Sequence, residues 1–569
     1  MKHRISGILA LLVLTALSLG AAPKYATTID FLDYVFYDTK DGNMEYYPLE
    51  VYEQRLRELA EGGISKVYLR VNVCGLVLYP TKFSAIYGQD GLLHWDGDLA
   101  LAKRLVNTLA RYDVCKETIR LGHKYGMEVW AWDSLWDESA YPFSRAKCPK
   151  KCLDVFDRND GIPLLDPWFR SHPEGFSMLD PRKFLAPERL AAVNREARKY
   201  PVARIVIANV PGGDSRRPMR VEADDVLILV SNDNRVYKPY DGKFEVKSGR
   251  DKAGLNFLEI KGLRISAPYI KVAHRSYFNG DFALVLREPR NQCKVYNTAG
   301  KLVPSVWAGA YDKRALEDGR FRFGQFDPFA WDYEDYQAAC LVGEVNPQQY
   351  FLGVTEFAVP AAAQHKLDRF VELADYPFDG FMWNTRSHSC LMGFEPDEYG
   401  FNPEVRSAFQ KRYGVDIWRE KFDLAKLYEL RAEAIADFFK RCKEKSGGRP
   451  VWLSGLPPVP GAYDTTQIPH MNRYFLKFPW LYKRYFADGS IDGVVMYGKG
   501  FIDHFTEEVT GGKPVKIGYF REMAKSCQPR GYDFKLDMQT LKADPRVAEV
   551  ELYEALILTK NPEMFKELK

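Results

Sequence analysis

Residues 379–417 read DGFMWNTRSHSCLMGFEPDEYGFNPEVRSAFQKRYGVDI and decide the fold class. Residues 379–382 form a short apolar segment that predicts a buried strand. Asn402 and Pro403 then begin a helix, with proline in the first turn, where its missing N–H costs nothing. Gly414 ends that helix. A buried strand, a polar loop and a helix form the unit of a (β/α)8 barrel, whose active site lies where the strands end.

The same alternation occurs upstream of this stretch. Three segments rich in aromatic and branched residues predict the first three strands, at residues 29–37, 67–73 and 127–132. Helical periodicity lies between them, at Leu49–Glu61 and at residues 100–125, with a break expected near residue 112. Strands that alternate with helices predict a parallel sheet with crossover helices.

Five more strands are expected downstream, which brings the total to eight and supports a closed barrel. Their predicted positions are residues 350–357, 379–382, 451–454, 491–497 and 515–520. Helices are expected between most of these strands, and a last helix is predicted over residues 536–558.

The alternation is interrupted between the third and fourth predicted strands. From residue 202 to residue 303 the chain contains short strand-like segments separated by turn residues, which is typical of a β-sandwich. The predicted fold class is therefore α/β: a (β/α)8 TIM barrel with an all-β, sandwich-like domain inserted between strands 3 and 4. The predicted divisions are a signal peptide (1–22), a first barrel part (23–186), the insertion (187–330) and a second barrel part (331–569).

The N-terminus has the order of a secretory signal peptide. A charged start precedes an apolar run over residues 8–19, and small residues follow at positions 20–22. The apolar run is short for a membrane span, and no other segment resembles one. We therefore expect a secreted or periplasmic protein that keeps no integral membrane segment after cleavage.

Composition and motifs disfavour several classes of function. The net charge is +4 without a long Lys/Arg run, so nucleic acid is not an expected partner. Of nine cysteines only Cys148 and Cys152 lie close together, and a four-cysteine zinc site needs a second such pair. A local disulfide and two unpaired thiols both remain open for that pair. No Gly-rich phosphate loop, HExxH or GxSxG pattern stands out, so no cofactor and no metal are expected.

Several motifs resemble the glycoside-hydrolase-like TIM-barrel families, the family 10-like group of exported bacterial proteins. They are VWAWDSLW, HPEGFSMLD, FDGFMW, YGFNPEVRSAFQKRYGVDI and IDGVVMYG. The resemblance covers about residues 25–140 and 340–530, and it implies a barrel that acts on glycosidic bonds. Relatives often carry an acidic residue where this chain has Trp383-Asn384. Asparagine cannot act as nucleophile or base, so any carboxylate role must lie elsewhere in the chain or be missing.

Hydrolysis of a glycosidic bond normally needs two carboxyl groups, and a barrel supplies them from strand ends. Glu356 is the predicted acid/base, because an apolar strand end could raise its pKa. Asp133, after the third strand, is its predicted partner as nucleophile or base. The structural alternatives are that Glu356 tethers a loop to the next helix and that Asp133 closes a turn.

Other residues are candidates for substrate binding. Aromatic residues make up 14% of the chain, and sugar faces bury well on aromatic rings. Candidate stacking residues, which could equally pack the core or rim, are Trp132, Trp136, Trp383 and Tyr497. Candidate ligands for hydroxyl, carboxylate or sulfate groups are Arg70, Asn384, Arg386 and His388. A buried ion pair is the alternative for Arg70. Glu398 is the candidate from an acidic loop that could also be merely solvated.

The sequence thus predicts an exported glycoside hydrolase that acts on a poly- or oligosaccharide through paired carboxylates at the C-terminal face of the barrel. The alternative is a non-catalytic glycan-binding or cell-surface protein on a degenerate glycosidase barrel. The inserted domain could bind carbohydrate, shape the cleft or contribute only stability.

Overall fold

The computed structural model describes most of the chain, with gaps. The described residues are 23–38, 44–73, 75–87, 99–140, 164–208, 221–234, 238–274, 292–303, 305–308, 337–342, 346, 349–385, 396–455, 479–496, 502–523 and 532–568.

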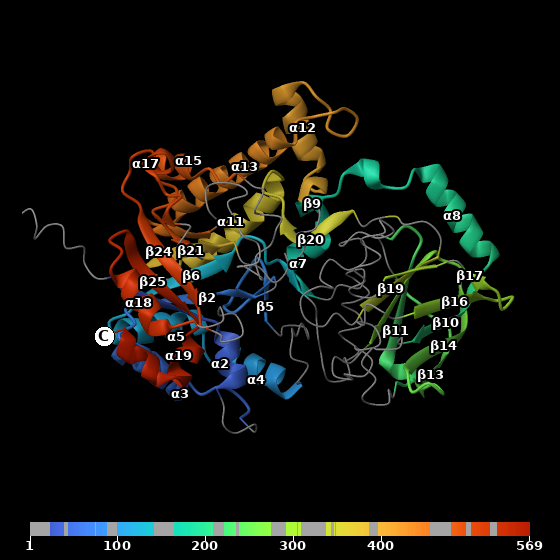
Figure 1. Cartoon of the computed structure of the whole chain (residues 1–569), viewed down its shortest axis with the longest axis horizontal. Coiled ribbons are helices and arrows are strands. Elements are labelled where there is room, and N and C mark those ends of the chain that lie inside the picture. The colour runs from blue at the N-terminus through green and yellow to red at the C-terminus, as the bar shows by residue number, and fades with distance from the viewer. Residues whose placement is uncertain are drawn as a thin grey trace, which may run out of the picture.

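Eight parallel strands close into a barrel, in agreement with the predicted fold class (Figure 1). In order around the barrel they are β1 (Lys24–Ile29), β2 (Lys66–Arg70), β6 (Glu128–Ser134), β21 (Gly380–Asn384), β22 (Val451–Gly455), β23 (Gly493–Met496), β24 (Lys516–Glu522) and β25 (Val547–Tyr553). Every neighbouring pair is parallel, and β25 pairs with β1 to complete the ring.

Helices follow most of these strands. They include α3 (Leu49–Glu61), α4 (Leu99–Leu109), α5 (Val114–Lys124), α11 (Pro360–Ala374), α12 (Pro403–Tyr413), α13 (Leu424–Lys445), α15 (Tyr482–Ala487), α18 (Phe534–Lys542) and α19 (Ala555–Lys560). The predicted break after α4 is confirmed, because the Asp113 carboxylate accepts from the Lys116 N–H and begins α5. Gly414, with φ of 71°, ends α12 as predicted.

The prediction of the first strand is wrong. Residues 24–29 form β1, and the following aromatic segment is the helix α2 (Phe31–Tyr37). The Asp30 carboxylate accepts from the Leu32 N–H and so caps this helix. An apolar run buries equally well as a helix or a strand, and the cap decides between them.

Two further errors cancel in the predicted count of eight. The predicted fourth strand is β20 (Tyr350–Thr355), which pairs antiparallel with β9 (Phe176–Met178) outside the barrel. The true eighth barrel strand, β25, lies inside the segment predicted as the last helix. The stretch from Asp379 therefore supplies the fourth barrel strand, not the fifth.

The all-β insertion lies between the third and fourth barrel strands, as predicted. It contains two five-stranded antiparallel sheets, β13-β14-β10-β16-β17 and β12-β11-β15-β19-β18. The strands are β10 (Val202–Ala208), β11 (Val226–Ser231), β12 (Lys238–Pro239), β13 (Glu245–Arg250), β14 (Asn256–Ile265), β15 (Tyr269–His274), β16 (Gln292–Asn297), β17 (Leu302–Val303), β18 (Ser305–Ala308) and β19 (Gln337–Val342).

One buried cluster joins the two sheets of the insertion. Ile205 and Leu258 belong to the first sheet, and Ile228 and Ile270 belong to the second. Their packing is that of a sandwich. Because β19 pairs with β15, the all-β region extends past the boundary predicted at residue 330.

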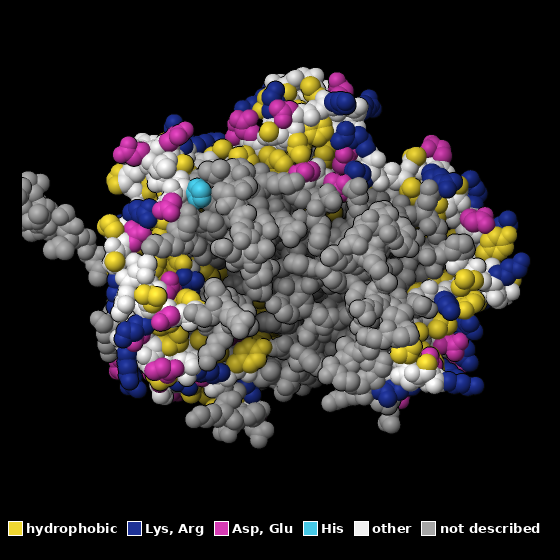
Figure 2. Space-filling model, in the orientation of Figure 1, with side chains coloured by type: hydrophobic (Ala, Val, Ile, Leu, Met, Phe, Trp, Pro, Cys, Tyr) yellow, Lys and Arg dark blue, Asp and Glu magenta, His cyan; other side chains and the backbone are white. Residues whose placement is uncertain are grey.

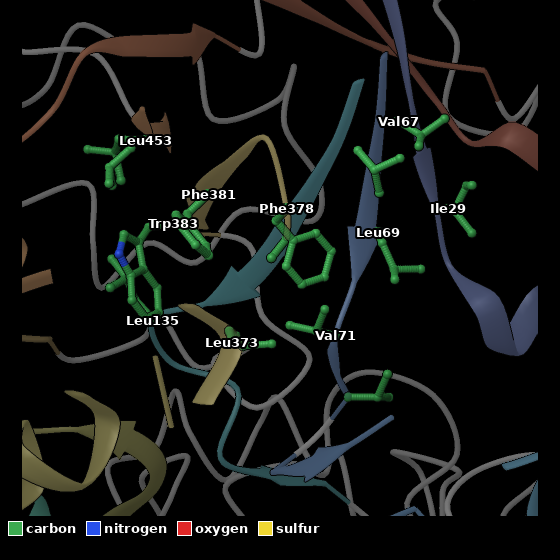
Figure 3. Close-up of a cluster of buried hydrophobic side chains, with 14 of the residues drawn as sticks. Ile29, Val67, Leu69, Val71, Leu135, Leu373, Phe378, Phe381, Trp383 and Leu453 are labelled. Atoms are coloured by element: carbon green, nitrogen blue, oxygen red, sulfur yellow. The ribbon is translucent and has the colours of Figure 1, made fainter. Parts of the chain in front are cut away.

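The side chains of the barrel strands divide into two layers. One set fills the barrel interior and includes Tyr68, Trp130, Trp132, Met382 and Trp452. The alternate residues pack between the barrel and its helices, and Figure 3 shows this layer with Val67, Leu69, Phe381, Trp383 and Leu453. Side chains of a strand alternate between its two faces. A residue at the end of a strand therefore points toward the barrel axis when the residue two positions earlier belongs to the interior layer.

An Asp-Gly pair stands at the start of β21 and again at the start of β23. Asp379 exchanges two hydrogen bonds with Val129 of β6: its N–H donates to the carbonyl (2.8 Å), and its carboxylate accepts from the N–H (2.7 Å). Asp492 makes the same two bonds, of 2.8 and 2.7 Å, with Val451 of β22. A Cβ on Gly380 would lie 2.6 Å from the Trp130 ring, and a Cβ on Gly493 would lie 2.5 Å from the Trp452 ring.

A buried ion pair lies among the aromatic rings of the barrel interior. The Lys66 ammonium is 2.9 Å from the Glu549 carboxylate, and it lies 3.5 Å from the centroid of the Trp130 ring. Tyr68 donates a hydrogen bond of 2.5 Å to the same carboxylate. Burial lowers the pKa of Lys66, and the Glu549 charge opposes that shift. Within the described structure, Lys66 thus supplies the positive charge that faces the buried Glu549 carboxylate.

We predict that Lys66→Met lowers the free energy of unfolding by about 3–5 kcal/mol, because Glu549 is left as a buried, unpaired charge. Chemical denaturation measures this change. The matched control is Lys66→Met with Glu549→Gln, which removes both charges and is expected to recover most of the loss. An unchanged stability of the single variant would contradict the argument.

Candidate active site

The C-terminal ends of the barrel strands carry polar side chains on the interior face. Asp30 follows β1, Arg70 ends β2, Asn384 ends β21 and Ser454 lies near the end of β22. All four are buried, at 7% exposure or less. For Arg70, Asn384 and Ser454, the residue two positions earlier belongs to the interior cluster, so strand alternation turns these end residues toward the barrel axis. We call this region the barrel mouth.

Arg70 links two carboxylates of the barrel mouth. Its Nη1 donates to Asp30 Oδ2 (2.6 Å) and its Nη2 donates to Asp137 Oδ2 (2.9 Å). Its Nε donates to the backbone carbonyl of Asn72 (3.0 Å), and the guanidinium lies 5.5 Å from the centroid of the Trp132 ring. One cation thus faces two buried carboxylates. The ion pair that was the alternative for Arg70 is present, and the guanidinium is engaged on three sides.

A pair of carboxyl groups lies where β25 meets β1. Asp33 is in the first turn of α2, and Glu554 directly follows β25. The two side chains lie close enough for the Glu554 carboxyl to act on the pKa of Asp33. Desolvation, then the negative charges of Asp30 and Glu554, raise the pKa of Asp33 well above its ordinary value of 3.8. Asp33 therefore keeps its proton to a higher pH than an ordinary aspartate, while its side chain remains partly exposed.

Asp33 and Glu554 are not among the site residues predicted from the sequence. Both fell in segments whose secondary structure was predicted wrongly, residues 29–37 and 536–558. Asp30 was a usable signal, because a carboxylate at the start of an apolar run is typical of a helix cap. That cap would have placed Asp33 in a first helical turn beside a strand end.

Glu356 and Asp133, the predicted catalytic pair, are each held by a different arginine. Glu356 follows β20, outside the barrel strands, and its Oε2 accepts from Arg431 Nε (2.9 Å). Ser177 donates a further hydrogen bond of 3.0 Å to the same oxygen. This contact ties β9 and β20 to α13. The catalytic role of Glu356 stays a prediction, but the acid sits in a buried ion pair.

Asp133 lies on the helix-facing side of β6. It alternates with Trp130 and Trp132, which point into the barrel, and its Oδ1 lies 4.0 Å from Arg369 Nη2 of α11. Its carboxylate also accepts from the N–H of Ser134 (2.8 Å). Strand alternation thus directs Asp133 away from the barrel axis. Its role as nucleophile or base also stays a prediction.

Behind Asp133 a buried ionic cluster joins α11 to the segments that lead into the insertion. Glu138 accepts from Lys366 Nζ and Arg369 Nη1, both at 2.5 Å. Asp166 Oδ1 lies 2.9 Å from the Nε2 of His365. Because the charges are paired and buried, this cluster is read as part of the framework.

The predicted stacking residues lie in different environments. Trp132 is buried in the barrel interior. Trp136 is buried beside Trp480, with ring centroids 5.8 Å apart. Trp383 packs against Phe370 in the layer between the barrel and its helices. Figure 3 shows Trp383 among the apolar side chains of this layer. These positions match the core-packing alternative.

The remaining candidates are partly described. Asn384 is fully buried at the end of β21. Glu398 forms an ion pair of 3.1 Å with Lys183. Arg386, His388 and Tyr497 lie outside the described residues, as do the signal segment and the pair Cys148 and Cys152.

Neither metal-binding groups nor membrane-spanning helices are found in the described ranges. No set of three or more His, Cys, Asp or Glu side chains there could hold a metal ion. No helix among those residues is both long and apolar enough to cross a membrane. On the face seen in Figure 2, basic and acidic side chains are interspersed over the coloured surface.

Comparisons with known proteins leave the family open. No family model matches the chain, and no curated protein matches it. Among solved structures, the catalytic domain of beta-amylase from Paenibacillus polymyxa aligns with 95% of this chain and 94% of its own. The identity is 7% and the TM-score is 0.37, so this likeness carries no information on activity. The barrel assignment rests on the strand pairing given above.

We predict that Glu356→Gln and Arg431→Met each lower the free energy of unfolding, by about 3–5 kcal/mol for the arginine variant, because each breaks a buried ion pair. Activity per folded molecule is expected to survive in both. Thermal unfolding measures the change in stability, and the activity divided by the concentration of folded protein measures the second effect. A hundredfold loss of activity confined to the Glu356 variant would instead establish the predicted acid.

Proposed function

We propose that this protein is an exported glycoside hydrolase that cleaves a poly- or oligosaccharide at the barrel mouth. The observation that carries the proposal is the group of carboxyls at the barrel mouth: Asp30, which Arg70 binds at 2.6 Å, and Asp33, whose pKa is raised by burial and by the charges of Asp30 and Glu554. Active sites of such barrels lie at this end of the strands. The export part rests on the sequence of residues 1–22.

The three carboxyl groups can divide the chemistry of glycoside hydrolysis. Asp33, which holds a proton, donates it to the glycosidic oxygen as the bond to the leaving sugar breaks. The Asp30 carboxyl, which accepts a hydrogen bond of 2.6 Å from Arg70, stabilises positive charge at the anomeric carbon or takes a proton from the attacking water. The Glu554 carboxyl, whose negative charge helps to raise the pKa of Asp33, favours the return of a proton to Asp33 from water. Environments that separate the protonation states of neighbouring carboxyls suit acid and base roles.

Aromatic surface at the barrel mouth supports a sugar as the substrate. Tyr553 immediately precedes Glu554, packs 5.5 Å from the ring of Phe520 and is partly exposed. A partly exposed tyrosine offers an apolar face for a sugar ring and a hydroxyl for its polar edge.

We expect Asp33→Asn to lower kcat by about 10²–10⁴-fold, the usual contribution of a positioned general acid. The assay is reducing-sugar release from a panel of neutral, amino, uronic-acid and sulfated polysaccharides. Asp423→Asn is the matched control, because Asp423 is exposed and caps α13 through a bond to the Ala425 N–H. Full activity of the Asp33 variant on a substrate that the wild type cleaves would refute the assignment.

The pH profile provides a second test. Because the active form of Asp33 is protonated, activity is expected to be present below its raised pKa and to be lost as pH rises through it. Glu554→Gln removes one of the negative charges that raise this pKa, so it should move the alkaline limb to lower pH. The measurement is kcat/KM against pH for both proteins. A limb that stays in place or moves to higher pH would exclude Asp33 as the acid coupled to Glu554.

A non-catalytic glycan-binding protein is the second candidate. Asn384 favours it, because members of the resembled group often carry an acid at this position. The pairing of Glu356 with Arg431 and of Asp133 with Arg369 also favours it. Affinity electrophoresis against the same panel separates the two functions. Retardation by a glycan without product after long incubation would favour the binding protein.

A further inference from the structure

We infer that Asn72 is a sugar-hydroxyl-binding residue and that the barrel mouth accepts neutral saccharides while it disfavours anionic ones. The inference rests on the proposed function, because it names the substrate class of the same site.

Asn72 belongs to the barrel mouth by its place in the chain. It begins β3 (Asn72–Val73), two residues after Arg70, the last residue of β2. Val71 and Val73 both pack in the layer between barrel and helices, so the side chain of Asn72 alternates onto the side of Arg70. The Arg70 guanidinium binds the Asn72 carbonyl, which fixes this backbone next to Asp30 and Asp137.

The amide of Asn72 is buried and unused. The side chain is 1% exposed, and within the described structure neither its Oδ1 nor its Nδ2 has a hydrogen-bond partner. Leaving such a group unpaired costs stability, so an unsatisfied buried amide calls for an explanation. The amide presents one acceptor and two donors on one rigid group. Two neighbouring hydroxyls of a sugar ring, one donating and one accepting, would satisfy it.

The charges around Asn72 argue for a neutral ligand. Arg70 is the cation nearest to the Asn72 carbonyl among the contacts described, and its Nη atoms are taken by Asp30 and Asp137. Two carboxylates against one guanidinium leave a negative surplus, and the Asp33 and Glu554 pair lies close to Asp30. A uronate or sulfate placed there would meet like charge, and the cation that the described residues place there, Arg70, is already paired with Asp30 and Asp137. The anion-binding role expected for Arg70 is therefore replaced by a framework role.

Asn72→Leu tests the inference, because leucine is close to asparagine in size and lacks the amide. We expect an equal or higher melting temperature, since an unpaired polar group is removed. Binding of a neutral oligosaccharide should weaken at least about tenfold, as for the loss of one or two hydrogen bonds. Asn107→Leu, on the exposed side of α4, is the matched control and should bind like the wild type.

Calorimetric titration of wild type and variants with neutral, uronic-acid and sulfated oligosaccharides gives the readout. Neutral sugars that bind both proteins alike, a preference of the wild type for anionic sugars, or a lower melting temperature of Asn72→Leu would each overturn the inference. The last result would mean that Asn72 serves the fold through a buried water. These outcomes leave the proposed function intact if Asp33→Asn still abolishes hydrolysis. If the wild type neither binds nor cleaves any saccharide, the proposed function itself fails.

Discussion

The pairing of β25 with β1 is the constraint on which the rest of this molecule depends. It joins segments at opposite ends of the chain: Thr28 Oγ1 donates to Glu551 Oε1 across a separation of 523 residues. The same closure brings Glu549 to Lys66 inside the barrel and Glu554 to Asp33 at the mouth. Loss of this one ladder would open the barrel, leave charges unpaired and separate the proposed acid from its partner.

The interior of the barrel is held by paired charges as well as by apolar packing. Replacing buried ion pairs by apolar residues is often neutral or stabilising, whereas removing one partner is costly. The barrel thus gains little net stability from the pair of Lys66 and Glu549, but it is destabilised when only one of the two charges is removed. Aromatic rings on either side of the ammonium add a favourable contact that an aliphatic core would lack.

The order of strands and helices, the insertion and several helix ends could be predicted from periodicity, glycine, proline and caps. The eighth strand was missed, although β25 alternates valine and leucine with Glu549 and Glu551, which is the period-two pattern of a strand. Helices lie directly before and after this short segment, at Phe534–Lys542 and Ala555–Lys560, and the prediction merged all three into one helix. The site residues were predicted less well than the fold. The alternation of faces in VWAWD could have shown that Asp133 points away from the barrel axis. The ion pair of Glu356 could not be foreseen, because its partner Arg431 is 75 residues away in the sequence.

The two Asp-Gly pairs have a consequence for how relatives of this chain are recognised. Each stands at the start of a strand, on the face of the barrel opposite to the mouth. The aspartate aligns the neighbouring strand, and the glycine leaves room for a tryptophan of that strand. A sequence likeness that depends on these dipeptides therefore indicates a shared barrel architecture, and it gives no information on the residues at the mouth. Two proteins that share these Asp-Gly pairs can therefore have the same barrel and different activities.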